Sequence, residues 1–336
     1  MDPREIPEPN QRPEGNPYKQ DPFADDFSRS NPYSTPEPLQ IESAQTDHPA
    51  EPGQPGEAHP RWWTPLAISG LAFMALLVTS TVLLGMLVML RGDPPTNVKE
   101  FVQAATAVSQ TRFGLVLLVA VPQLAMVAVP ILAAFLSPVP TRQRLGLVRG
   151  HWPLWTWVAA AATPLVGMVS GVVIGLFMEE SESLKEMTQL FRQHGENGFL
   201  IPLALLIGAT PAVCEELLFR GYVQTRLTRS FGPAIGIIVA SFLFAAFHFD
   251  LVHVIAVFPM GLFLGWVSWR SGSLFPAMMG HFVNNVISVV AVVLAPEADP
   301  GVLALPAIAF TVAILGAGIV GMAAVFVASV LYGRPQ

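Results

Sequence analysis

Long apolar runs alternate with short polar segments through residues 61–336. Each run holds about 20 residues, the length that a helix needs to cross the hydrocarbon core of a bilayer. The runs lack the alternation of barrel strands, and only helices or closed barrels satisfy their backbone groups in lipid. The pattern predicts an all-α, polytopic membrane protein with a bundle of about eight helices, at 62–90, 113–137, 152–178, 199–222, 233–250, 252–269, 274–295 and 303–332.

Residues 1–60 have a different composition, rich in Pro, acidic residues, Ser and Gln and poor in aliphatic residues. Such a segment cannot bury enough apolar surface to order itself, so we expect a disordered cytoplasmic tail. It carries twelve acidic against four basic residues, a net charge of -8, whereas the whole chain carries -6. The remaining +2 gives no basic footprint for nucleic acid, and the tail is a candidate docking segment for a cytoplasmic partner.

Seven arginines fall in every second loop of the predicted bundle or after its last helix, and the opposite loops include 179–186 and 296–299, which are acidic on balance. The positive-inside rule assigns the basic side to the cytoplasm. The seven tryptophans lie at predicted helix ends on the same side, as interfacial anchors do. We therefore expect a multi-pass protein of the plasma (inner) membrane with both termini in the cytoplasm. The basic residues are Arg142, Arg144, Arg149, Arg226, Arg229, Arg270 and Arg334.

Ionisable and amide side chains interrupt three of the apolar runs. A charged residue at mid-helix costs roughly 2.5–3.5 kcal/mol even on the mildest insertion scales, so each is a hypothesis about function. They are Glu215, Glu216 and Arg220 in the fourth predicted helix, His248 and Asp250 at the end of the fifth, and His281, Asn284 and Asn285 in the seventh.

The spacing of these residues indicates a shared site. Glu216 and Arg220 are four residues apart and can pair on one helix face, and the same spacing joins His281 to Asn285. The fourth and fifth helices run antiparallel about a turn near 231–232, which brings Glu215 and His248 to similar heights at about 1.5 Å per residue. We expect the three helices to converge on one polar pocket.

The pocket has the parts that amide hydrolysis needs. One glutamate held by Arg220 leaves its neighbour free to act as a general base on water, and an imidazole can share the proton transfer. A histidine and an asparagine one turn apart can donate hydrogen bonds to an oxyanion. The same residues suit proton-coupled transport nearly as well.

Three motifs occur in order: EELLFR at 215–220 fits EExxxR, FAAFH at 244–248 fits FxxxH, and HFVNN at 281–285 fits HxxxN. With the context GSLFPAMMGHFVNN at 272–285, they resemble the type II CAAX prenyl protease family. This family is also called the CAAX protease and bacteriocin-processing (CPBP, Abi) family. The resemblance covers about residues 145–295, within a transmembrane domain of residues 61–336.

The resemblance implies an intramembrane peptidase with a polar cavity open to the cytoplasm. It implies that Glu215 and His248 activate water, that His281 and Asn285 stabilise the oxyanion, and that Glu216 and Arg220 support the site. Phe244, four residues before His248, fits a packing partner for that histidine better than a substrate contact.

A divalent metal such as Zn is the alternative means of activating water. If one binds, Glu216, His248 and His281 are its candidate ligands. The HExxH signature is absent, and the polar residues already supply a base and oxyanion donors, so we favour a metal-free, glutamate-dependent mechanism.

Several other residues have plainer interpretations. Asp250 and His253 fit interfacial positions, and Cys214 fits a buried small hydrophobe. Glycines at four-residue spacing predict close helix packing. They are Gly167, Gly171 and Gly175 in the third predicted helix and Gly261 and Gly265 in the sixth.

The sequence thus favours an endopeptidase that cleaves an apolar, membrane-embedded or lipid-linked peptide. One alternative is a non-proteolytic scaffold or immunity-type protein whose tail recruits partners, and a less favoured one is a proton-coupled transporter.

Overall fold

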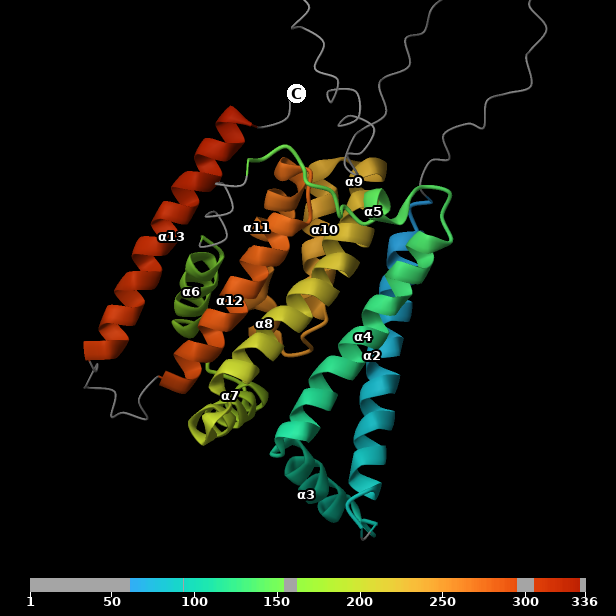
Figure 1. Ribbon diagram of the computed structural model, residues 1–336, viewed down its shortest axis with the longest axis vertical. Coiled ribbons are helices and arrows are strands. Elements are labelled where there is room, and N and C mark those ends of the chain that lie inside the picture. The colour runs from blue at the N-terminus through green and yellow to red at the C-terminus, as the bar shows by residue number, and fades with distance from the viewer. Residues whose placement is uncertain (1–60, 93, 154–161, 295–304, 333–336) are drawn as a thin grey trace, which may run out of the picture.

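The computed structural model describes residues 61–92, 94–153, 162–294 and 305–332 (Figure 1). Within these ranges the regular structure is entirely helical, as the apolar runs predict. The tail predicted at residues 1–60 lies outside the described residues. The helices are α2 (Thr64–Met89), α3 (Val98–Ser109), α4 (Arg112–Phe135), α5 (Thr141–Arg144), α6 (Ala162–Gly175), α7 (Glu182–His194), η2 (Gly195–Phe199), α8 (Leu200–Glu216), η3 (Leu217–Gln224), α9 (Thr225–Phe231), α10 (Pro233–Ala246), α11 (Leu251–Ser271), α12 (Phe275–Leu294) and α13 (Leu305–Leu331).

Six helical segments of the described chain are long and apolar enough to cross a membrane. They are α2, α4, the segment Glu182–Phe231, which runs from α7 to α9 with a kink at Asn197 and Gly198, α11, α12 and α13. The apolar helices α6 and α10 are shorter, with 14 residues each. Large apolar side chains such as Val82, Leu132 and Phe242 are exposed on these helices, as a lipid-facing surface requires. The chain is a multi-pass membrane protein.

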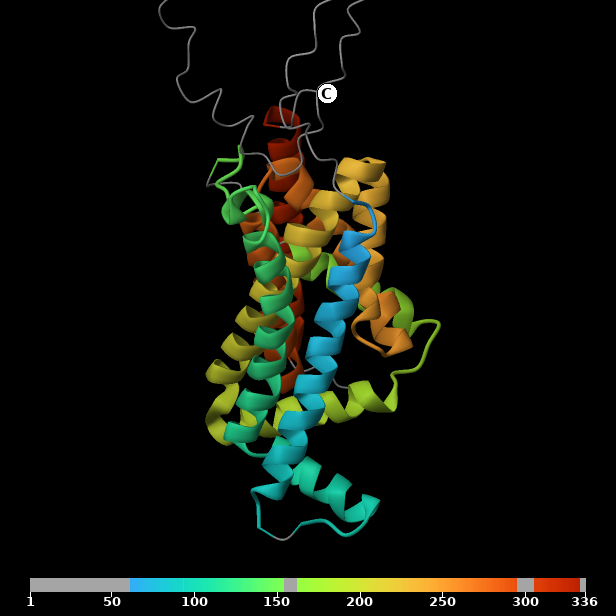
Figure 2. The same cartoon turned by 90° about the vertical axis from the view of Figure 1, so that its right-hand side faces the viewer.

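The helices form a bundle with α2 and α4 packed together at one edge and α13 against α6 at the other (Figure 1). Between these edges, α8 packs on α12, and α10 packs on α11. The start of α2 and the end of α13 lie at the same end of the bundle as α5 and α9, and α3 and α7 lie at the opposite end (Figures 1 and 2). The described loop arginines Arg142, Arg144, Arg226 and Arg229 belong to α5 and α9, so they share one end.

The turn after α9 has the conformation that its sequence indicates. Gly232 adopts φ 84°, a left-handed value that favours glycine, and Pro233 begins α10. The predicted end of the fourth helix at 222 is wrong, however, because the helix continues through η3 and α9 to Phe231. The π-helix η3 begins directly after Glu216, and such π turns are frequent at functional sites.

Two amphipathic helices were not predicted from the apolar runs. Residues 179–186 were expected to form a loop, but α7 begins at Glu182, with Ser181 as its N-cap. The helix α3 likewise occupies the segment between α2 and α4. Both helices are too polar for a spanning run, and α7 places Met187, Leu190 and Phe191 on the face directed at the bundle.

The glycines have mixed roles. Gly261 and Gly265 do permit close packing, because a Cβ on Gly265 would lie 2.6 Å from the Gln224 Oε1 atom. The prediction for the third helix is wrong at Gly171 and Gly175, where a Cβ would meet nothing within 4 Å. At Gly167 a Cβ would lie 2.7 Å from Asn284 Oδ1, so this glycine makes room for a polar side chain.

Candidate active site

A buried ionic cluster lies where α8 and η3 pack against α11 and α12. Arg220 Nη1 donates to Glu216 Oε1 at 2.7 Å, and His281 Nδ1 lies 2.9 Å from the same oxygen. The side chains of Glu216 and Arg220 are fully buried, and Arg220 also donates to the Gly261 carbonyl at 3.0 Å. Buried charges are tolerated when they are paired and hydrogen-bonded, and Glu216 Oε1 meets both conditions, whereas Glu216 Oε2 is buried and accepts no hydrogen bond from the described residues.

Phe244 of α10 connects this cluster to His248. Its ring centroid lies 4.3 Å from the Arg220 guanidinium carbon, 5.6 Å from the His281 ring and 5.4 Å from the His248 ring. The ring is fully buried and does not line the cavity described below. Phe244 is therefore a packing partner of His248, as its spacing indicates.

Glu215 points away from its neighbour Glu216, because successive residues on a helix are turned by about 100°. Its carboxylate is half-buried and accepts a hydrogen bond at 2.8 Å from Gln123 Nε2 on α4. Glu215 borders a cavity of about 880 Å³, a size typical of ligand sites.

This cavity brings together residues from three separate parts of the sequence. Glu215, His248, His281 and Asn285 all line it, together with a largely apolar wall from α2, α4, α6, α7, α12 and α13. Glu216 and Arg220 do not line the cavity but lie behind it, where they hold His281. The four residues that line the cavity are those expected to take part in the reaction, and Glu216 and Arg220 are those expected to support them; these roles stay predictions.

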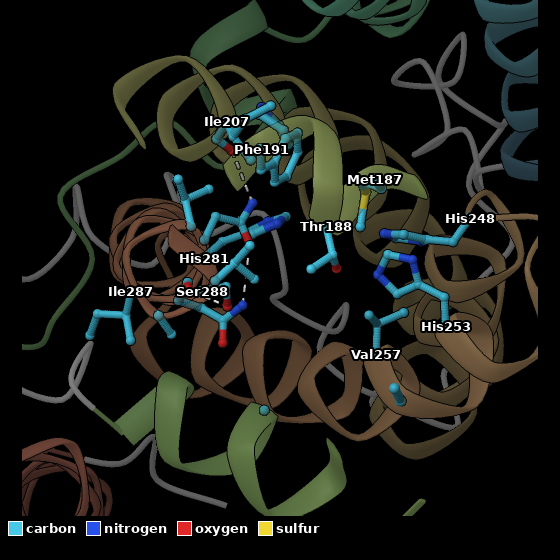
Figure 3. Close-up of a pocket in the computed structure, with 18 of the residues that line it drawn as sticks. Met187, Thr188, Phe191, Ile207, His248, His253, Val257, His281, Ile287 and Ser288 are labelled. Carbon is cyan, nitrogen blue, oxygen red and sulfur yellow. Dashed lines mark hydrogen bonds between the residues drawn. The ribbon is translucent and has the colours of Figure 1, made fainter. Parts of the chain in front are cut away.

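His248 and His253 lie side by side at one end of the cavity, with ring centroids 4.4 Å apart (Figure 3). His248 Nδ1 lies 3.2 Å from the Ala245 carbonyl. A carbonyl only accepts, so the contact assigns the proton to Nδ1 and leaves Nε2 as an acceptor. The side chain of His253 lines the cavity beside His248.

Helix α7 lies against the same end of the cavity. Met187 and Thr188 lie between His281 and the His248–His253 pair (Figure 3). Asp250 fastens this helix to α11, because its carboxylate accepts from the Ser183 hydroxyl at 2.7 Å and from the His253 amide at 2.9 Å. Asp250 is an N-cap, which agrees with its expected non-catalytic position.

Two asparagines of α12 form a short chain of amides. Asn285 Nδ2 donates to the Ile207 carbonyl at 3.2 Å, and Asn284 Nδ2 donates to Asn285 Oδ1 at 3.2 Å. Each amide nitrogen carries two hydrogens, so Asn285 keeps one N–H for a ligand. Both asparagines line the cavity.

The candidate metal ligands Glu216, His248 and His281 are not gathered into one group of three. In the described part of the chain, no three His, Cys, Asp or Glu side chains are placed to hold a metal ion. Of the candidate ligands, Glu216 accepts from Arg220 and His281 through Oε1, and its Oε2 accepts no hydrogen bond from the described residues. We therefore derive no step through a metal.

The sequence interpretation did not place Gln123 or His253 at the cavity, although each contacts a predicted site residue. Gln123 lies outside the recognised motifs, and its signal was a single amide in the otherwise apolar α4. His253 sits five residues after His248, where helical spacing alone gives no reason to expect contact, because a turn separates α10 from α11. Both were visible as polar residues near or within apolar runs.

The fold and the cavity define a polytopic helical membrane protein with glutamate and histidine side chains at a buried cavity. Residues 197–287 match the family model described as type II CAAX prenyl endopeptidase Rce1-like. The match contains all three motifs and is shorter than the 145–295 expected. A search of curated proteins and a search of solved structures each found no match.

Proposed function

We propose that this protein is an intramembrane endopeptidase that hydrolyses a peptide bond by means of water activated by Glu215 and His248. The observation that carries the proposal is the convergence of Glu215, His248, His281 and Asn285 on one cavity. The Rce1-like match supports a CAAX-type protease in general.

The steps follow from the atoms that face the cavity. Glu215 takes a proton from a water that also donates to His248 Nε2, and the hydroxide attacks the substrate carbonyl carbon. Asn285 donates its second amide N–H to the oxyanion, and His281 donates from Nε2 when its ring is protonated. Glu215 then returns its proton to the leaving nitrogen, and the C–N bond breaks.

The cavity wall suggests the class of substrate. Residues such as Leu118, Met168 and Val289 line it, so the binding of an apolar segment or an attached lipid chain is favourable because it buries apolar surface. We propose a membrane-embedded or lipid-linked peptide as the substrate, and the family description makes a prenylated C-terminal peptide the first to test.

We also propose the plasma membrane as the location, with both termini in the cytoplasm. The ends of α2 and α13 lie with α5 and α9, which carry the loop arginines (Figure 1). In that orientation α7, which lies at the opposite end and lines the cavity, is on the outer side.

The test uses the purified full chain in liposomes with a fluorogenic farnesylated peptide and the same peptide without the lipid. We expect cleavage of the lipidated peptide, loss of at least about 100-fold in kcat for Glu215→Gln and His248→Ala, and normal cleavage for the control Glu186→Gln, an exposed residue. Equal activity of Glu215→Gln and wild type refutes the mechanism.

Deletion of residues 1–60 separates this function from the scaffold alternative. A hydrolase retains its peptidase activity without the tail. A protein that acts only by recruiting partners shows no peptidase activity with or without the tail, and loses its cellular phenotype when the tail is deleted.

A further inference from the structure

We infer that Gln123 is a positioning residue for Glu215, an inference that rests on the proposed function. Gln123 belongs to α4, outside the Rce1-like match at residues 197–287. After Arg112 it is the only polar side chain in this 24-residue helix. A polar amide in a membrane-spanning helix is costly unless it is paired, so its presence needs a reason.

The hydrogen bond from Gln123 has only one workable direction. Gln123 Nε2 lies 2.8 Å from Glu215 Oε1, and an ionised carboxylate can only accept. Reversing the amide would place two acceptor oxygens against each other. The amide nitrogen therefore donates to Glu215, and the contact suits Glu215 as a carboxylate that is ready to take a proton.

The bond leaves one carboxylate oxygen for the reaction. The terminal torsion of a glutamate is broad and roughly two-fold, so an unrestrained carboxylate turns freely. Gln123 holds Oε1, while Oε2 accepts no hydrogen bond from the described residues and is not enclosed. Oε2 is then the atom that faces water in the cavity, and general-base catalysis requires that one oxygen be held in place.

The other end of the amide argues against a purely structural role. Gln123 Oε1 is buried and has no hydrogen-bond partner among the described residues. An unsatisfied buried acceptor costs about 1–3 kcal/mol, so a methionine of similar length would fill this space with less penalty. The amide is explained by what its nitrogen does for Glu215.

The chain supplies a matched control in Gln224. Its Nε2 donates to the Gly265 carbonyl at 2.8 Å, and its Oε1 is also buried and without a partner. Gln224 does not line the cavity. The same change to methionine at both positions therefore removes the same kind of interhelical hydrogen bond, next to Glu215 in one case and away from it in the other.

The experiment measures kcat and KM on the farnesylated fluorogenic peptide and the infrared carboxylate band of Glu215. Subtracting the Glu215→Gln spectrum from that of the parent protein isolates the band. We expect Gln123→Met to lower kcat roughly 10- to 100-fold with KM within about two-fold, and to shift the band. Gln224→Met leaves both kcat and the band at wild-type values.

Each other outcome counts against the inference. An unmoved band in Gln123→Met shows that the hydrogen bond is absent, and an unchanged kcat shows that it does not serve the reaction. An equal loss of kcat in Gln224→Met shows a general packing effect. If Gln123→Met does not fold, Gln123→Asn withdraws the amide by one methylene and gives the same test. A wild-type protein inactive on the peptide refutes the proposed function, and the band shift alone then decides the inference.

Discussion

Removing Arg220 should destabilise the protein more than any other single loss of charge. Arg220→Met breaks the 2.7 Å ion pair and leaves Glu216 fully buried, with His281 as its remaining partner. Removing one member of a buried ion pair costs about 3–5 kcal/mol. The Gly261 carbonyl also loses its donor, and Phe244 loses a cation–π contact. We expect a loss of at least about 3 kcal/mol in the free energy of unfolding.

The assay is reversible unfolding in mixed micelles, followed by tryptophan fluorescence. Adding Glu216→Gln to Arg220→Met removes the stranded charge and should restore more than about half of the lost free energy. Lys185→Met is the control, because its ion pair with Glu182 is solvent-exposed and should contribute at most about 1 kcal/mol. A loss of less than about 1 kcal/mol for Arg220→Met, or a double variant less stable than the single one, refutes the reasoning.

Three further predictions concern the cavity and its surroundings. Gly167→Leu should lower kcat roughly 100-fold by displacing Asn284, whereas Gly171→Leu should not, because a Cβ at Gly171 would meet nothing within 4 Å; equal effects contradict this. Chelators such as EDTA and phenanthroline should leave peptidase activity unchanged, and a loss restored by Zn would contradict the metal-free mechanism. The pKa of Asp250 is lowered to about 2 by hydrogen bonds from the Ser181 hydroxyl, the His253 amide and the Ser183 hydroxyl. The stability that the Asp250 link between α7 and α11 contributes is therefore fully present above about pH 4, the pKa of an aspartate in the unfolded chain. It is lost as pH falls through about 2, the pKa of Asp250 in the folded protein. Hydrogen exchange of α7 should rise over that range, and Asp250→Ala should show the same exchange at pH 7; exchange independent of both changes refutes the link.

The sequence predicted the helical bundle because hydropathy reports directly on lipid contact. It also predicted that Glu215, His248 and His281 would share one pocket, and all three line the same cavity. Their catalytic roles stay predictions. The division between Glu215 at the cavity and Glu216 behind it needed the structure, because adjacent residues differ only in their direction about the helix axis.

The parts that were missed share a physical cause. Helices α3 and α7 are amphipathic, so a criterion based on continuous apolar length passes over them. Gln123 and His253 reach the cavity through tertiary contacts from α4 and α11, which no local spacing encodes. Gly171 and Gly175 show the converse error, because their regular spacing predicts close packing, yet a Cβ at either position would meet no atom of the described residues within 4 Å.

The most direct test of the account is a double-variant cycle in kcat for Glu215→Gln and His248→Ala on the farnesylated peptide. Two side chains that act on the same water form one unit, so losing both should cost no more than losing the more important one. We predict that each single variant loses at least about 100-fold in kcat and that the double variant loses no more than the worse of the two. Losses that multiply, or a single variant with wild-type kcat, would contradict a shared water at this cavity.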